Sequence, residues 1–243
     1  MKIVKFFFSL LIIAIIGCVI YLGYLGFIPI VSNIMGANKP KDLGIKYTKE
    51  NYDSYIQKGG TEIKYVKTGG NPADSVKLSG IKNVKDNFSQ EDISARLNYS
   101  NWKYMPVKNT QVRINKGGTV EFSANVIMNR LPGFIAYTGL GKYSVEDVNK
   151  GLKYINLLKV DPPIYLKFKA SVKHNLPDLE IQIIQVGKYI LPLEKLGANQ
   201  VITQAVENVF LKANGFHAMS AKFSDGQLIF DGTVPAVMEV ESN

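Results

Sequence analysis

The chain has 243 residues, of which 46% are hydrophobic and 20% are charged, and its formal net charge is +9. It holds a single cysteine, Cys18, which excludes a disulfide framework and a cysteine-based metal site. The first 38 residues contain only two charges, Lys2 and Lys5. The remaining roughly 200 residues are enough for one domain with a sizeable core.

The N-terminal segment from Phe6 to Val31 contains no charged residue. It exceeds the roughly 20 apolar residues that cross a bilayer. It also exceeds the apolar core of a cleavable signal peptide, and no small-x-small cleavage site ends it. Residues 1–36 are therefore predicted to form a cytoplasmic tip and an uncleaved transmembrane anchor, with the lipid bilayer as the partner of Phe6–Val31.

The orientation of this anchor follows from the flanking charges. Lys2 and Lys5 favour a cytoplasmic N-terminus and an extracytoplasmic C-terminal domain, although Lys39 and Lys41 on the far side weaken that preference. The expected location is the cell membrane, with a single pass. An alternative is a lipoprotein signal, because the residues before Cys18 loosely fit the pattern for lipid attachment. The segment after Cys18 stays apolar, which favours the uncleaved anchor.

The positive charge of the domain indicates a class of partner. A basic face outside a membrane is better suited to anionic lipid headgroups or an anionic envelope polymer than to nucleic acid. The alternative is that the charge only keeps the domain soluble. No protein partner is indicated.

Residues 37–87 are predicted to form a tether and an N-terminal extension with one helix and two strands. The tether is Ala37–Lys46, the helix Thr48–Lys58, and the strands are Thr61–Thr68 and Ser75–Ile81. A second helix is predicted over Ser89–Asn98.

Residues 88–236 are predicted to form the main α+β domain, and residues 237–243 a tail. The expected elements are a hairpin of Thr110–Asn115 and Thr119–Met128, a loop over Leu131–Lys142, a helix over Ser144–Leu158, strands Ile164–His174 and Leu179–Ile184 around a turn at residues 175–178, a helix over Leu193–Ala213, and a hairpin of Met219–Phe223 and Gln227–Val234. Strands joined by short turns must pair antiparallel.

Three similar stretches begin the expected helices: F-S-Q-E-D-I at Phe88–Ile93, Y-T-K-E-N-Y at Tyr47–Tyr52, and Y-S-V-E-D-V at Tyr143–Val148. In each, a hydroxyl residue is suited to cap the helix, and apolar or aromatic residues flank it at the positions of a hydrophobic staple. Capping physics is sufficient to explain this repetition.

A catalytic constellation is not found in the sequence. His174 and His217 each lie beside a turn, and neither has a second ligand type at metal spacing. The Gly-Gly pairs are not placed between a strand and a helix in a phosphate-binding motif. We therefore expect a non-enzymatic protein without a cofactor or metal.

The main functional signal is an apolar face shared by the strands and the last long helix. Strand Ile164–His174 alternates, with Leu166 and Phe168 on one side and lysines on the other. Either this face is an ordinary packed core, or sheet and helix leave a slot for an acyl chain. The residues predicted to line such a slot are Val120, Phe122, Val126, Leu166, Phe168, Leu179, Ile181, Ile183, Val209, Phe210, Phe223 and Phe230. The residues predicted to contact a headgroup or polymer are Lys167, Lys169 and Lys173.

The order of elements over about Phe88–Val234 resembles bacterial membrane-anchored envelope proteins of the tubular lipid-binding (TULIP-like) superfamily. The resemblance rests on the helix opened by F-S-Q-E-D-I-S-A-R-L-N, the following hairpin, and the phrase V-G-K-Y-I-L-P-L at Val186–Leu193 before a long helix. It implies a strongly curved antiparallel sheet that wraps the long helix, an apolar groove for a lipid or isoprenoid chain, and no catalysis.

Two functional hypotheses follow. The first is a membrane-anchored lipid-binding domain. The second is a membrane-anchored assembly module of the cell envelope with a packed core, whose partner surface would be the aromatic loops Trp102–Tyr104 and Phe134–Tyr143. An apolar cavity favours the first and an exposed aromatic patch the second. An enzyme is a third possibility and requires polar residues that converge in a cleft.

Overall fold

The computed structural model describes residues 2–26, 28–67, 69–138, 161–193 and 198–242, with side chains described except at residues 2–11, 198–201, 204 and 205. The helices in this part are α1 (Lys2–Tyr24), α2 (Pro29–Ile34), α3 (Lys49–Gly59), α4 (Gln90–Asn98), α5 (Leu131–Thr138) and α8 (Ala198–Lys212), with short 3-10 turns at Pro72–Asp74 and Met128–Arg130. The strands are β1 (Glu62–Val66), β2 (Val76–Ser79), β3 (Lys82–Ser89), β4 (Val107–Ile114), β5 (Thr119–Val126), β6 (Pro163–Lys173), β7 (Leu176–Val186), β8 (Tyr189–Ile190), β9 (His217–Ser224), β10 (Gln227–Val234) and β11 (Val237–Glu241).

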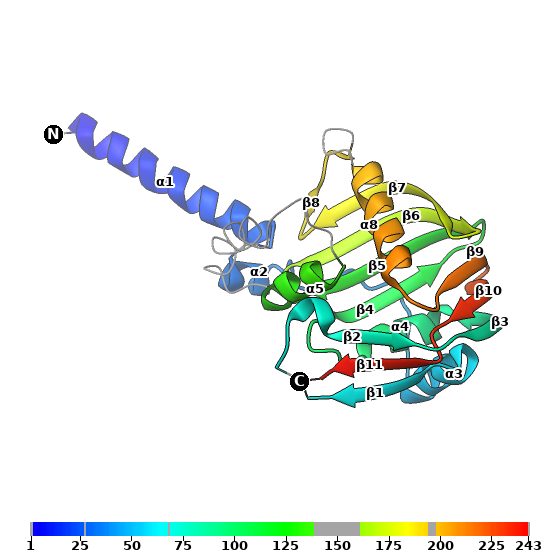
Figure 1. Ribbon diagram of the computed structural model, residues 1–243. Coiled ribbons are helices and arrows are strands. Elements are labelled where there is room, and N and C mark those ends of the chain that lie inside the picture. The colour runs from blue at the N-terminus through cyan, green and yellow to red at the C-terminus, as the bar shows by residue number, and fades with distance from the viewer. Residues whose placement is uncertain (1, 27, 68, 139–160, 194–197, 243) are drawn as a thin grey trace.

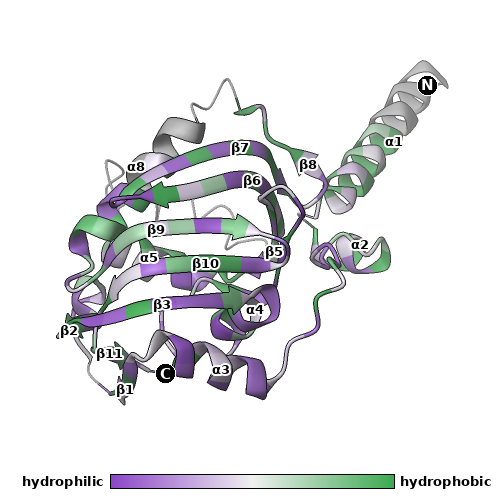
Figure 2. Ribbon diagram, turned by 90° about the vertical axis from the view of Figure 1, so that its right-hand side faces the viewer, coloured by the Kyte–Doolittle hydropathy of each residue, from purple (hydrophilic) through white to green (hydrophobic). Residues whose placement is uncertain are grey.

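The predicted α+β class is confirmed, and its main element is a strongly curved antiparallel sheet that forms a half-barrel (Figure 1). Within the described residues the sheet has eight strands in the order β3-β10-β9-β6-β5-β4, and β7 pairs with β6 and β8. Hydrophobic and hydrophilic residues alternate along its long strands (Figure 2). Helix α8 packs on β7 over one face, which we call the inner face.

The sheet divides at β6. One edge of β6 pairs with β7 from Ile164 to Lys173. The other edge pairs first with β5, through residues 163–169, and then with β9, through residues 171–173. Two separate groups of strands therefore extend from this edge of the β6–β7 hairpin. One group is β5 and β4, and the other is β9, β10 and β3. Helix α4 packs against both, because Ile93 contacts the apolar clusters of each group.

Helix α4 also closes the free edge of β4. Three of its side chains, spaced four residues apart, accept hydrogen bonds from alternate amides of that strand. The bonds join Ile114 N to Gln90 Oε1 at 3.0 Å, Val112 N to Ser94 Oγ at 2.9 Å, and Thr110 N to Asn98 Oδ1 at 2.9 Å. Four helical residues rise about 6 Å and two strand residues about 6.8 Å, so the two spacings match closely. The helix thus replaces a neighbouring strand.

Two of the three predicted helix starts are confirmed. Ser89 Oγ accepts a bond from Asp92 N at 3.0 Å, while Ser89 N donates to Asp92 Oδ2 at 3.2 Å, which completes a capping box before α4. Ile93 packs against the cluster that contains Phe88, as a hydrophobic staple requires. Thr48 and Asn51 form the equivalent box before α3. The third start and the predicted helix Ser144–Leu158 lie outside the described residues.

A second, three-stranded sheet joins the two ends of the domain. Its order is β1-β11-β2, with β1 parallel to β11 and β11 antiparallel to β2. Residues 237–243, which the sequence predicted to be a tail, therefore contain a central strand. Similarly, β3 lies within the predicted extension at residues 37–87 but pairs with β10 in the main sheet.

Two local predictions are wrong. The segment predicted as a loop over Leu131–Lys142 begins with helix α5, whose Pro132 lies in the first turn, where proline is tolerated. The turn predicted at residues 175–178 is instead a two-residue turn of His174 and Asn175, with φ of 50° and 63°. Consequently β7 begins three residues earlier than predicted, at Leu176.

The tether crosses the outer face of the sheet as a strap of residues 41–45. Leu43 and Ile45 are buried against Tyr165. Lys41 Nζ lies 3.8 Å from the centre of the Tyr165 ring and 3.4 Å from Glu121 Oε2, to which the Tyr165 hydroxyl donates at 2.7 Å. The strap therefore covers apolar surface on the face of the sheet where the alternation places the lysines of β6.

Helix α1 projects away from the domain (Figure 1). Its end meets the main sheet where Lys188 N donates to Leu25 O at 3.3 Å, and Ser32 Oγ in α2 donates to Gly23 O at 2.8 Å. Within the described part of the chain, no helix combines the length and hydropathy needed to cross a membrane.

Replacing Ser94 with Ala tests the contact between α4 and β4. The change leaves the Val112 amide without its acceptor, so it should lower the free energy of unfolding by about 1–3 kcal/mol. Helix propensity alone predicts a small gain, because Ala is the better helix former. Urea denaturation measures the difference. Ser79→Ala, at an exposed serine, is the control, and a Ser94→Ala protein as stable as wild type contradicts the proposed edge contact.

The strap predicts a pH-dependent stability. Burial alone would raise the pKa of the Glu121 carboxyl, but hydrogen bonds from Tyr165 and Asn115 and the Lys41 ammonium group bring it below its ordinary value. A carboxyl with a lowered folded-state pKa stabilises the protein above its unfolded-state pKa, and this contribution is lost as pH falls through the folded-state value. Glu121→Gln should therefore destabilise by about 1–2 kcal/mol at neutral pH and far less near pH 3. Urea titrations at both pH values, with the exposed Glu180→Gln as control, check this. An equal cost at both pH values would exclude an electrostatic role.

Candidate functional site

The inner face of the main sheet is hollowed by two cavities, of about 350 Å³ and about 310 Å³. Ligand-binding pockets typically measure roughly 300–1,000 Å³. Val172, Phe210 and Phe223 line both cavities, so the two adjoin. The apolar face predicted from the sequence is thus not filled entirely by its own side chains.

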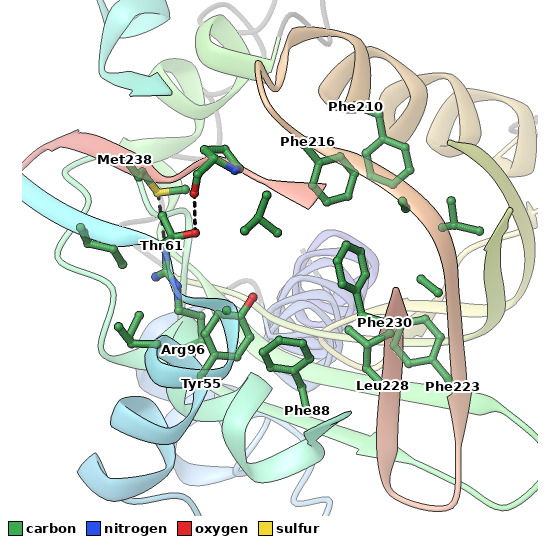
Figure 3. A pocket seen from close by; sticks show the side chains of 18 residues that line it. Tyr55, Thr61, Phe88, Arg96, Phe210, Phe216, Phe223, Leu228, Phe230 and Met238 are labelled. Atoms are coloured by element: carbon green, nitrogen blue, oxygen red, sulfur yellow. Dashed lines mark hydrogen bonds between the residues drawn. The ribbon is translucent and has the colours of Figure 1, made fainter. Parts of the chain in front are cut away.

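The first cavity lies between the main sheet, helix α3 and the small sheet. A row of cross-strand neighbours forms one wall, since Leu228 is paired with Phe88 on one side and with Phe223 on the other. Figure 3 shows Phe210 and Phe216 across the cavity from this row. Alternation within the strands places these side chains on one face.

The second cavity lies between the β6–β7 hairpin and α8. Leu166 and Phe168 from β6 line it, together with Leu179 and Ile181 from β7. Helix α8 contributes the side chains of Ile202, Val206 and Phe210, which recur every four residues and therefore lie on one side of the helix. This part agrees with the predicted arrangement of a long amphipathic helix on the sheet.

Seven of the twelve predicted lining residues border the cavities: Leu166, Phe168, Leu179, Ile181, Phe210, Phe223 and Phe230. Val120 is buried in a packed cluster with Val112 and Ile114, and Phe122 packs against that cluster. Val126 and Val209 line neither cavity. The packed-core interpretation thus describes the β4–β5 side of the sheet, and the slot interpretation describes the other side.

Ile183 requires a correction, because it lies on the outer face. It packs with Tyr165 and the strap residues Leu43 and Ile45. The pairing of β6 with β7 shifts between Lys167, opposite Ile183, and Phe168, opposite Ile181. The extra residue in β7 reverses the alternation beyond it, as a β-bulge does.

The three predicted headgroup lysines lie on the outer face as well, away from both cavities. Lys167 lies opposite Glu121 and Ile183 in the sheet register. Lys169 Nζ is 4.0 Å from Glu180 Oε2, and Lys173 is exposed. They cannot contact the headgroup of a lipid whose chain occupies an inner cavity. Any anion that they bind must be a separate one.

The aromatic loops that were expected to form a partner surface pack against one another in their described part. Trp102 is 7% exposed, and its ring centre lies 5.9 Å from that of Phe134 and 5.1 Å from that of Tyr137. Its Nε1 donates to Ser75 Oγ at 3.1 Å, and burial raises the pKa of Tyr137. These contacts remove the main support for an exposed aromatic patch. Residues 139–143 lie outside the described part.

The most informative lining residue missed by sequence reasoning is Arg96. Its guanidinium lies 3.9 Å from Met238 Sδ and 6.0 Å from the centre of the Tyr55 ring. It is the one charged side chain in the described lining of the first cavity. No local sequence pattern predicts that Arg96 lines a cavity, because the other walls beside it come from α3 and β11, which are distant in sequence.

The described linings of both cavities contain no histidine or cysteine. Among the described residues, no group of three or more His, Cys, Asp or Glu is arranged to hold a metal. The arrangement can bury an apolar chain and place a cation beside it.

Comparisons with protein-family models, with curated proteins and with solved structures find no match to this chain.

Proposed function

We propose that this chain is a membrane-anchored protein that binds a lipid or isoprenoid chain, without catalysis, between the inner face of its sheet and helix α8. The observation that carries the proposal is the pair of adjoining apolar cavities joined at Val172, Phe210 and Phe223. At roughly 25 cal/mol per Å² of buried apolar surface, one acyl chain would gain on the order of several kcal/mol there.

The arrangement of the sheet and α8 is consistent with the tubular lipid-binding resemblance. A strongly curved antiparallel sheet covered by a long amphipathic helix is the arrangement that the resemblance implies. We extend the resemblance to function only as far as an apolar ligand. The small sheet of β1, β2 and β11 lies outside the region of resemblance, and it supplies part of the first cavity.

We further propose that Phe6–Val31 anchors the chain in a bilayer, with the domain on the extracytoplasmic side. Large apolar side chains are exposed along α1 and α2, including Ile13 at 65%, Ile30 at 75% and Ile34 at 81%. Such a density of exposed apolar residues is typical of surfaces that contact lipid or protein. Cys18 is exposed on the same helix, so lipid attachment is the alternative anchor. The outer-face lysines Lys167, Lys169 and Lys173 are proposed to meet the anionic surface or an anionic envelope polymer.

Filling the first cavity should remove the bound lipid. Ala221 lines the cavity from β9, and its neighbour Lys222 is exposed. Adjacent strand residues point to opposite faces, so Ala221→Phe blocks the cavity, whereas Lys222→Phe adds the same ring outside it. The full-length protein is purified from membranes, and its lipids are extracted and quantified by mass spectrometry. Wild type and Lys222→Phe should retain one lipid class in near-stoichiometric amount, and Ala221→Phe should lose most of it.

Thermal melts show whether both variants fold cooperatively. The proposed function is ruled out if the wild-type protein carries no lipid above the level of the surrounding membrane. It is also ruled out if Ala221→Phe folds and keeps its lipid.

A further inference from the structure

The first cavity is apolar except at one end, where Arg96 lies. Two carboxylates on elements that border the cavity are already paired. Asp92, four residues earlier on α4, is 2% exposed and lies 2.7 Å from Lys58 Nζ. Glu62 on β1 lies 3.6 Å from Lys64 Nζ. No ion pair within the described residues involves Arg96.

The contacts that Arg96 does make are weak for a cation. A thioether sulfur is a poor hydrogen-bond acceptor, and the face of an aromatic ring attracts a guanidinium only modestly. A guanidinium has five N–H donors in a planar fork that matches a carboxylate or a phosphate. Most of these donors have no partner among the described residues.

Two residues with hydroxyl groups, Tyr55 and Thr61, line the same cavity as Arg96. The Tyr55 hydroxyl points toward the middle of the space in Figure 3, and it makes no hydrogen bond within the described part of the chain. The Thr61 hydroxyl donates to Pro235 O at 2.8 Å, which leaves its own lone pairs free. The donors available to a ligand, the Arg96 guanidinium and the Tyr55 hydroxyl, are therefore at one end of the cavity, and Phe210, Phe223 and Phe230 line its other part.

We propose that Arg96 and Tyr55 form a headgroup subsite that selects a single-chain amphiphile with an anionic head, such as a carboxylate or a phosphate monoester. The head is held by the guanidinium fork and the tyrosine hydroxyl. The chain runs past Phe88, Leu228 and Phe223 and enters the second cavity at Val172. This inference rests on the proposed function and adds the chemical class and the orientation of the ligand.

A paired-probe experiment tests this subsite. The full-length protein is placed in nanodiscs of zwitterionic lipid. It is then titrated with a long-chain fatty acid that carries a photoreactive group in the middle of its chain, the part that crosses the first cavity, and separately with the matching fatty alcohol. A second pair, an isoprenyl monophosphate and its alcohol, distinguishes a phosphate from a carboxylate head. Labelling of peptides from β9 and β10 as a function of probe concentration gives an apparent affinity for each probe.

In the pair whose acidic probe binds more tightly, wild type should bind that probe at least about tenfold more tightly than the matching alcohol. Hydrogen bonds to a charged group are stronger than those to a neutral one. Arg96→Met should abolish this preference while labelling by the alcohol persists. Arg96→Lys should keep part of it, because the charge remains and the fork is lost. Tyr55→Phe should reduce it by a smaller factor. Arg113→Met makes the same substitution on β4, outside both cavities, and should have no effect.

The outcomes separate the two proposals. If neither member of either pair labels β9 or β10, the proposed function fails and the subsite fails with it. If acid and alcohol label wild type equally, a lipid-binding cavity stands and the subsite is overturned. A preference for the acid that survives in Arg96→Met also overturns it, because the anion is then recognised elsewhere. The comparison within wild type does not depend on whether a variant folds.

Discussion

The structure depends on helix α4, which packs against both groups of strands into which the main sheet separates. The sheet separates into two groups of strands beyond β6, and β4 would otherwise expose a row of backbone groups at its edge. Gln90, Ser94 and Asn98 satisfy that edge because their spacing along a helix nearly equals the spacing of alternate residues along a strand. An edge covered in this way is closed to pairing with other chains. The capping box of Ser89 and Asp92 fixes where the helix begins and therefore which side chains meet β4.

The same helix connects the packed side of the sheet with the hollow side. Ile93 and Leu97 complete the apolar cluster around Val120, while Arg96 lies at the end of the first cavity. Asp92 is paired with Lys58 rather than with Arg96, so the guanidinium is left for another anion. One short segment thus closes the core and supplies the cation beside the cavity. An apolar chain in that cavity would add contacts with the surrounding aromatic side chains, and close contacts of this kind are a main source of core stability.

Much of the fold could be predicted from local rules. Alternation along β6, β9 and β10 placed the apolar face correctly, and capping chemistry located α3 and α4, because both signals are contained within a few neighbouring residues. Elements whose signal depends on distant partners were missed. Strand β3 has only two buried apolar residues, Val84 and Phe88, and β11 is a strand because β1 and β2 flank it. Ile183 was placed on the wrong face because the sequence gives no sign of a one-residue bulge in the pairing of β7 with β6.

The candidate site shows the same limit. Alternation along the strands identified Leu166, Phe168 and Phe223 as inner-face residues. It does not indicate which part of that face is packed and which part borders a cavity.

The central claim is that a single apolar chain occupies the two adjoining cavities. Its most direct test is a high-resolution experimental structure of the full-length protein purified from membranes without added lipid. We expect continuous density for one chain from Arg96, past Val172, to Ile202 on α8. The claim would be contradicted if the phenylalanine side chains of α8 and β10 packed against each other and filled this space.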